Sequence, residues 1–110
     1  MITEEDALTY YLPVFFTEFE TEAEFLDVVN EFLSMLPATK VVRANINNKS
    51  GISDLLVCYH GLFVALELKD NTGEPSKQQL KFIADIKQAG GRGAVCSTLA
   101  EVYNTLRNGD

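Results

Sequence analysis

The chain of 110 residues has few of the features that mark secreted scaffolds, zinc sites or membrane proteins. It contains two cysteines and one histidine, too few for a disulfide framework or a zinc site. It lacks the run of about eighteen apolar residues that a membrane span needs. Its first six residues include three acids where a secretory signal would be basic. We therefore expect one globular domain in a reducing cytoplasm, with no membrane partner.

Basic residues are missing from the first third of the chain. Residues 1–39 carry nine acids and no Lys or Arg, whereas residues 40–110 carry nine basic and seven acidic side chains. The net charge of −7 argues against a nucleic-acid partner. The excess of negative charge, however, comes from residues 1–39 alone, and a solvated acidic surface is the simplest account of that segment. The remainder has a slight positive excess and can still meet a phosphate backbone.

Hydrophobic periodicity, capping signals and turn residues predict an α/β domain. The predicted elements are a short helix before Pro13, a helix over 21–36, strands over 41–46, 54–59 and 62–69, a helix over 76–88, a strand over 93–97 and a helix over 98–107. Apart from the first short helix, the order is helix, three strands, helix, strand, helix. We divide the chain into an acidic helix with its connector (1–20) and a single globular unit (21–110).

The third predicted strand carries two charges at its end. Side chains alternate across a sheet, so Glu67 and Lys69 share a face with Phe63 and Ala65. Both faces of the strand are largely apolar, which predicts helices on both sides of the sheet. Charges in such a central position lose favourable hydration. The alternative is that the strand simply ends there and both groups reach water as a weak ion pair.

Asp54 gives the functional interpretation more weight. It precedes the apolar run of the second predicted strand, and a hairpin between the second and third strands can bring it beside Glu67. Two carboxylates that converge near an ammonium group form a site for a hard divalent cation.

These motifs together resemble the VRR-NUC nucleases. The residues that carry the resemblance are Gly51-Ile52-Ser53-Asp54, Gly61-x-Phe63, Glu67-Leu68-Lys69, Ser76-x-x-Gln79-x-x-Phe82-Ile83 and Gly90-Gly91. The VRR-NUC family lies within the PD-(D/E)xK superfamily, which also contains restriction-endonuclease-like enzymes and Holliday-junction resolvases. The resemblance implies a restriction-endonuclease-like fold, with a mixed central sheet flanked by helices in the order α-β-β-β-α-β-α.

The resemblance also implies roles for individual residues. Asp54 and Glu67 would coordinate Mg²⁺ or Mn²⁺, with the backbone carbonyl of Leu68 as a further ligand. Lys69 would stabilise charge on the scissile phosphate or help to activate water. Gln79 would sit beside the metal site. Such a cation neutralises the phosphoryl oxygen, and a lysine stabilises the charge that builds up in the transition state.

Two further positions bear on the resemblance. Ser53 stands where the superfamily's name has proline, whose role there is conformational rather than chemical. Many relatives carry an acid on the first core helix, and Glu22 is the candidate for it as a further metal ligand. The alternative for Glu22 is a first-turn acid that is favoured by the helix dipole.

The predicted function is metal-dependent cleavage of DNA by an endonuclease. The resemblance suggests that compact relatives of this size act as homodimers on branched DNA such as Holliday junctions, in a bacterial or phage-infected cell. A second hypothesis is a catalytically silent nuclease-fold protein that binds a basic partner through its acidic N-terminal segment. The intact set of Asp54, Glu67 and Lys69 favours the enzyme, and the net charge favours the binding protein.

Overall fold

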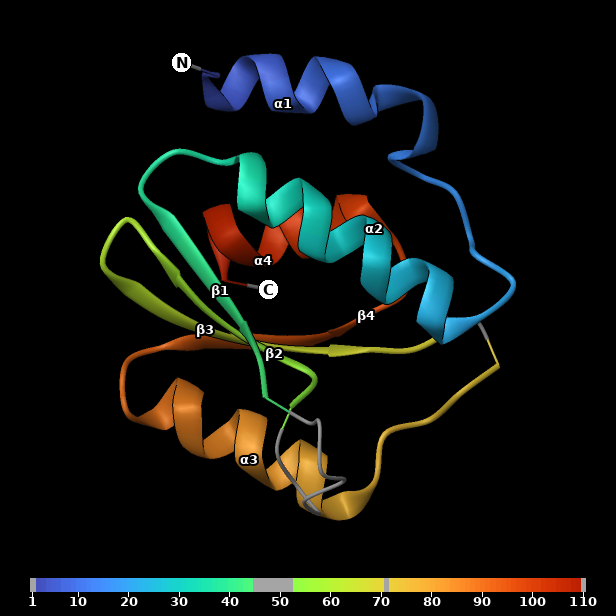
Figure 1. The fold of residues 1–110 in the computed structure, drawn as a ribbon. Helices are drawn as coiled ribbons and strands as arrows, with labels where there is room; N and C mark the ends of the chain where they lie inside the picture. The colour runs from blue at the N-terminus through green and yellow to red at the C-terminus, as the bar shows by residue number, and fades with distance from the viewer. Residues whose placement is uncertain (1, 45–52, 71, 110) are drawn as a thin grey trace.

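A computed structural model describes residues 2–44, 53–70 and 72–109 and contains a four-stranded mixed sheet (Figure 1). The strands are β1 (Thr39–Arg43), β2 (Leu55–Tyr59), β3 (Leu62–Leu68) and β4 (Arg92–Cys96). Their order in the sheet is the order in the sequence. The pairs β1–β2 and β2–β3 are antiparallel, and β3–β4 is parallel.

Helices cover both faces of this sheet. They are α1 (Glu4–Tyr11), a short 3₁₀ helix η1 (Leu12–Val14), α2 (Glu22–Met35), α3 (Lys77–Gln88) and α4 (Leu99–Asn108). Helices α1, α2 and α4 lie on one side of the sheet, and α3 lies alone on the other (Figure 1). The predicted mixed sheet with flanking helices is confirmed. No helix in the described residues is long and apolar enough to cross a membrane.

The sequence placed most elements to within two residues, and the differences have simple causes. Helix α1 ends at Tyr11, before Pro13 as predicted, because a proline cannot donate the backbone hydrogen bond that an α-helix needs; Pro13 lies within the 3₁₀ helix η1. The strand expected over 41–46 begins two residues earlier and ends at Arg43. The expected last residues of this strand, 45 and 46, and the segment that follows to residue 52, which includes Lys49, lie outside the described residues.

Helix caps hold the predicted starts of α2 and α4, but the reciprocal bond of a capping box, which the Thr-x-x-Glu patterns predict, forms at neither helix. Thr21 accepts a hydrogen bond from the Glu24 amide, as its position before α2 predicts. Thr98 does the same for Glu101 at α4. The Glu101 carboxylate, however, accepts from the amide of Ser97 rather than from Thr98, so the expected reciprocal bond is shifted by one residue.

The core lies between the sheet and the layer of α2 and α4. Helix α2 buries one face, because apolar residues recur at helical spacing along it. These residues pack on the alternate side chains of β2 and β3 that point to the same side. The largest fully buried apolar members are Phe25, Phe32, Leu33, Leu55, Leu66, Leu68, Leu99 and Leu106.

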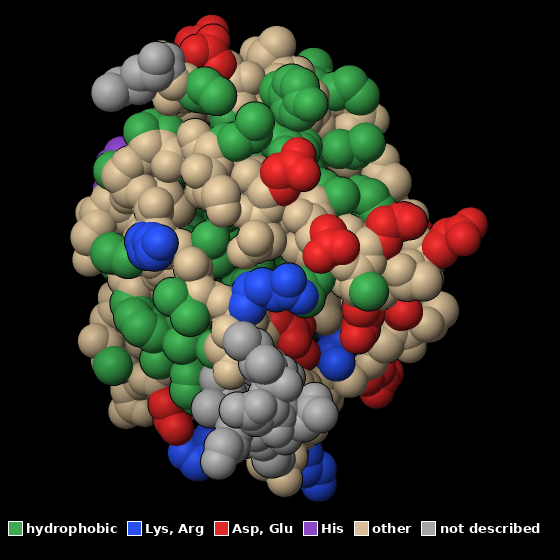
Figure 2. Space-filling model, viewed as in Figure 1, with side chains coloured by type: hydrophobic (Ala, Val, Ile, Leu, Met, Phe, Trp, Pro, Cys, Tyr) green, Lys and Arg blue, Asp and Glu red, His purple; other side chains and the backbone are tan. Residues whose placement is uncertain are grey.

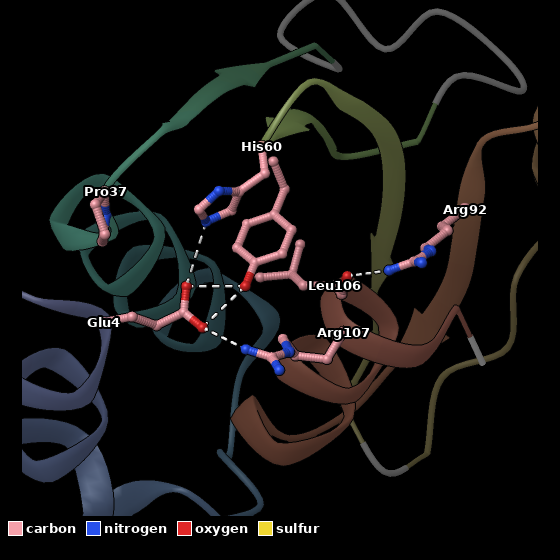
Figure 3. Close-up of a pocket in the computed structure, with 7 residues that line it drawn as sticks. Glu4, Pro37, His60, Arg92, Leu106 and Arg107 are labelled. Carbon is pink, nitrogen blue, oxygen red and sulfur yellow. Dashed lines mark hydrogen bonds and ion pairs between the residues drawn. The ribbon is translucent and has the colours of Figure 1, made fainter.

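Helix α1 packs on the domain through the buried side chains of Ala7 and Tyr11, and the Glu4 carboxylate adds a polar attachment (Figure 3). The hydroxyls of Tyr59 and Tyr103 donate hydrogen bonds of 2.8 Å and 2.7 Å to it, and the Arg107 guanidinium donates one of 3.1 Å. Burial raises the pKa of Glu4, but these hydrogen bonds outweigh burial and hold the pKa below its ordinary value. The acidic segment therefore packs on the domain, on the side of the sheet opposite α3.

Replacing Glu4 with glutamine is expected to lower the free energy of unfolding by about 1–3 kcal/mol, because hydrogen bonds to a charged group become neutral ones. Urea denaturation at pH 7 measures this change, and Glu5→Gln is the matched control, since Glu5 is an exposed neighbour in the same helix turn. Equal midpoints for the two variants would show that Glu4 does not anchor the helix.

Candidate active site

Asp54 and Glu67 are neighbours on the sheet face that carries α3. Asp54 immediately precedes β2, and Glu67 is the penultimate residue of β3. The antiparallel register pairs Leu55 with Leu66, so the next pair outward is Asp54 with Glu67. The Leu68 amide donates a hydrogen bond of 2.9 Å to Asp54 Oδ2, which fixes that carboxylate against the end of β3. The hairpin therefore brings the two predicted ligands together.

Glu67 is a buried carboxylate with an unpartnered oxygen. Its exposed fraction is 1%, and Oε1 has no hydrogen-bond partner among the described residues. Its Oε2 lies 3.3 Å from the Lys69 ammonium nitrogen. The pKa of Glu67 is raised to about 7, first by burial and then by the negative charge of Asp54, against the opposing effect of Lys69. Such a group destabilises the fold unless something else binds it.

Lys69 bridges two acids that come from different parts of the chain. Its ammonium nitrogen lies 3.3 Å from Glu67 Oε2 and 3.7 Å from Glu22 Oε1. Burial lowers the pKa of Lys69, but the charges of Glu22, Glu67 and Asp54 outweigh burial and raise it. The first residue of α2 thus reaches the site from the other layer of the fold. The structure places Glu22 beside Lys69, and its role as a further metal ligand stays a prediction.

Gln79 has a local structural contact. Its side-chain oxygen accepts a hydrogen bond of 2.8 Å from the Ser76 amide, and the Ser76 hydroxyl accepts one of 3.1 Å from the Gln79 amide. This reciprocal pair is a capping box at the start of α3. The Ser-x-x-Gln pattern was the signal for it in the sequence. A position of Gln79 beside a metal stays a prediction, as does the backbone carbonyl of Leu68 as a ligand.

The two carboxylates suit an oxygen-liganded divalent cation. Within the described residues no group of three or more His, Cys, Asp or Glu side chains is arranged to hold a metal. Mg²⁺ does not need one, because it is bound through one or two carboxylates together with waters and substrate phosphates. The buried oxygen of Glu67 without a partner is a site at which a cation would compensate the charge. Asp54 and Glu67 therefore fit Mg²⁺ or Mn²⁺.

Comparison with known proteins agrees with this geometry at the level of the fold. No model of a protein family matches the chain, and no curated protein matches it by sequence. The chain is similar to a solved structure described as a VRR_NUC domain, with a TM-score of 0.63 and 21% sequence identity, over 79% of this chain and 95% of that chain. The chain thus shares the fold of that VRR_NUC domain, a mixed sheet flanked by helices. The predicted fold is confirmed, and the likeness supports the relation to VRR-NUC nucleases that the motifs indicate.

Proposed function

We propose that this protein is a metal-dependent endonuclease that hydrolyses phosphodiester bonds in DNA. The observation that carries the proposal is Glu67, whose carboxylate is 1% exposed, lies beside Asp54 and keeps one oxygen without a partner. A buried charge at the end of a central strand lowers the stability of the fold, so its presence is explained by a function rather than by stability. The nuclease-domain fold supports DNA as the substrate.

Each residue of the site has a separate task in this reaction. Asp54 and Glu67 would bind the cation, and the Leu68 amide orients Asp54. The cation, when bound, supplies Lewis-acid polarisation of the phosphoryl oxygen and lowers the pKa of water. Lys69, held between Glu67 and Glu22, presents a positive charge that stabilises the phosphate as negative charge accumulates in the transition state.

The finer proposal is a homodimer that acts on branched DNA. A two-fold dimer would present two such sites, one for each strand of a junction. Side chains of the N-terminal segment offer an apolar surface for this contact, because Tyr10, Leu12 and Phe16 are between 62% and 73% exposed. Light scattering on the intact protein is expected to give twice the mass of one chain, and the mass of one chain would contradict this proposal.

A panel of labelled DNA tests the activity directly. Linear, nicked, flapped and four-way DNA are incubated with Mg²⁺, with Mn²⁺ or with a chelator. We expect cleavage only where a cation is present, and faster cleavage of the branched molecules. Intact DNA in every lane, together with binding of a basic protein, would instead support the catalytically silent module.

A further inference from the structure

Among the residues that the structure describes, one helix covers the sheet face that carries Glu67, and it covers only half of that face. Helix α3 packs on β3 and β4, where Ile83 lies close to Gly93. Of the described helices, only α3 lies on this side of the sheet in Figure 1, and its main contacts are with β3 and β4 rather than with β1 and β2. On the half formed by β1 and β2, Val42 is 53% exposed, and Cys58 is exposed as well.

The uncovered part of this face has Asp54 and Glu67 at one end and the ring of Phe63 at the other. Because side chains alternate, Leu56 and Cys58 on β2 share the face of Asp54, and Phe63 on β3 shares the face of Glu67. The register places Phe63 opposite Cys58, four residues from Glu67. At about 3.3 Å per residue, Phe63 is about 13 Å from Glu67 along the strand.

This region forms an apolar groove with a cationic rim, which we call the Phe63 groove. Its volume is about 270 Å³, and its lining side chains are Lys40, Val42, Leu56, Val57, Cys58 and Phe63. Phe63 is 45% exposed. Figure 2 shows hydrophobic side chains gathered at the lower left, over the part of the fold where β1 and the end of α3 lie in Figure 1. The groove is smaller than the roughly 300–1,000 Å³ of sites for drug-sized ligands, so its occupant is a small flat group.

We propose that the Phe63 groove binds an unpaired nucleobase of the DNA strand that is cut at Asp54 and Glu67. This inference rests on the proposed nuclease function and adds the class of substrate, namely DNA with unpaired bases near the cleavage site. The distance of 13 Å corresponds to about four nucleotides at a rise of about 3.4 Å. A base within a duplex keeps both faces stacked, whereas an unpaired base can stack on an exposed aromatic ring.

The charges around the groove favour a nucleic acid over a second copy of this chain. Its one charged lining residue is Lys40, and Arg43 is also exposed on the same edge strand. The two acids of the site, Asp54 and Glu67, lie at the far end of the same face, and many of the other acids visible in Figure 2 gather on the opposite side of the view, over α2. Edge-to-edge pairing of two β1 strands would bring the cations of both copies together, which is unfavourable. A phosphate backbone beside Lys40 is attracted instead, and Arg43, which alternates to the other face of β1, adds positive charge at the same edge of the sheet.

Fluorescent DNA tests the groove independently of catalysis. Single-stranded oligonucleotides that contain 2-aminopurine are titrated with Glu67→Gln protein, and emission and anisotropy are recorded. We expect quenched emission from stacking and about tenfold weaker binding when Phe63→Ala is added. Phe63→Leu keeps apolar bulk without the ring and should also lose the quenching. Ile2→Ala is the control, because Ile2 is an apolar side chain with the same exposed fraction as Phe63, 45%, and lies outside the groove.

Cleavage assays and light scattering separate the possible failures. With otherwise native protein, Phe63→Leu should slow the cutting of flapped DNA and leave the cutting of plain duplex unchanged. Equal rates and equal quenching in both Phe63 variants and the parent would overturn the groove proposal, even if DNA is cut. If no DNA is cut but the quenching depends on Phe63, the nuclease proposal fails and the groove stands. A change of mass on Phe63→Leu substitution would show that the groove is an interface between copies, which also overturns the proposal.

Discussion

Alanine at Asp54, Glu67 or Lys69 is expected to reduce DNA cleavage by about a hundredfold or more while the fold is retained. Each substitution removes a cation-binding carboxylate or the charge that faces the phosphate, and the loss of one such contact commonly has an effect of this size. Initial rates on the preferred DNA of the panel measure the change. Glu74→Ala and Lys87→Ala are the matched controls, since both are exposed, and they should cut at the parent rate.

Calorimetric titration with Mg²⁺ distinguishes the roles within this set. Asp54→Ala and Glu67→Ala should lose the cation, whereas Lys69→Ala should still bind it and fail only in cleavage. A Glu67→Ala protein with full activity would end the assignment of the site.

Glu67→Gln is expected to make the protein more stable at pH 8, by an amount on the order of 1–3 kcal/mol, although it removes the activity. In the unfolded chain the Glu67 carboxyl titrates at its ordinary pKa of 4.5, and in the fold it titrates at about 7. The folded state thus holds the proton more tightly. This contribution to stability is fully present below about pH 4.5 and is lost as the pH rises through 7. Glutamine cannot ionise, so the variant keeps its stability across this range.

Thermal unfolding in a chelator at pH 5 and at pH 8 measures the difference between the two proteins. The advantage of Glu67→Gln should be small at pH 5 and several degrees at pH 8. Added Mg²⁺ should raise the midpoint of the parent at pH 8 and leave the variant unchanged, because only the parent keeps both carboxylates. Glu74→Gln, an exposed change of the same chemistry, should follow the parent. The same stability difference at both pH values would show that the charge of Glu67 is not the cause.

Local patterns in the sequence determined much of the fold and named the central residues of the site. The alternation of apolar residues placed Glu67 and Lys69 on one face of β3, and the turn at His60-Gly61 made a hairpin with β2 the simplest connection. Periodicity and caps placed the helices well, since these signals act within a few residues of chain. The Ser76-x-x-Gln79 pattern also contained the signal for the capping box that Gln79 closes, although only a place beside the metal was predicted for Gln79.

The tertiary structure decided how these residues are surrounded. Only packing from distant segments makes Glu67 1% exposed, brings Glu22 to Lys69 and lets Glu4 join α1 to residues of β2 and α4. The position of α3 decides that Phe63 stays exposed on the same face as Asp54 and Glu67. The physical reason is that the direction of a side chain follows from its own backbone, which the local sequence specifies. Its burial, charge partners and exposure depend on groups that are remote in the chain and meet it only when the layers of the fold assemble.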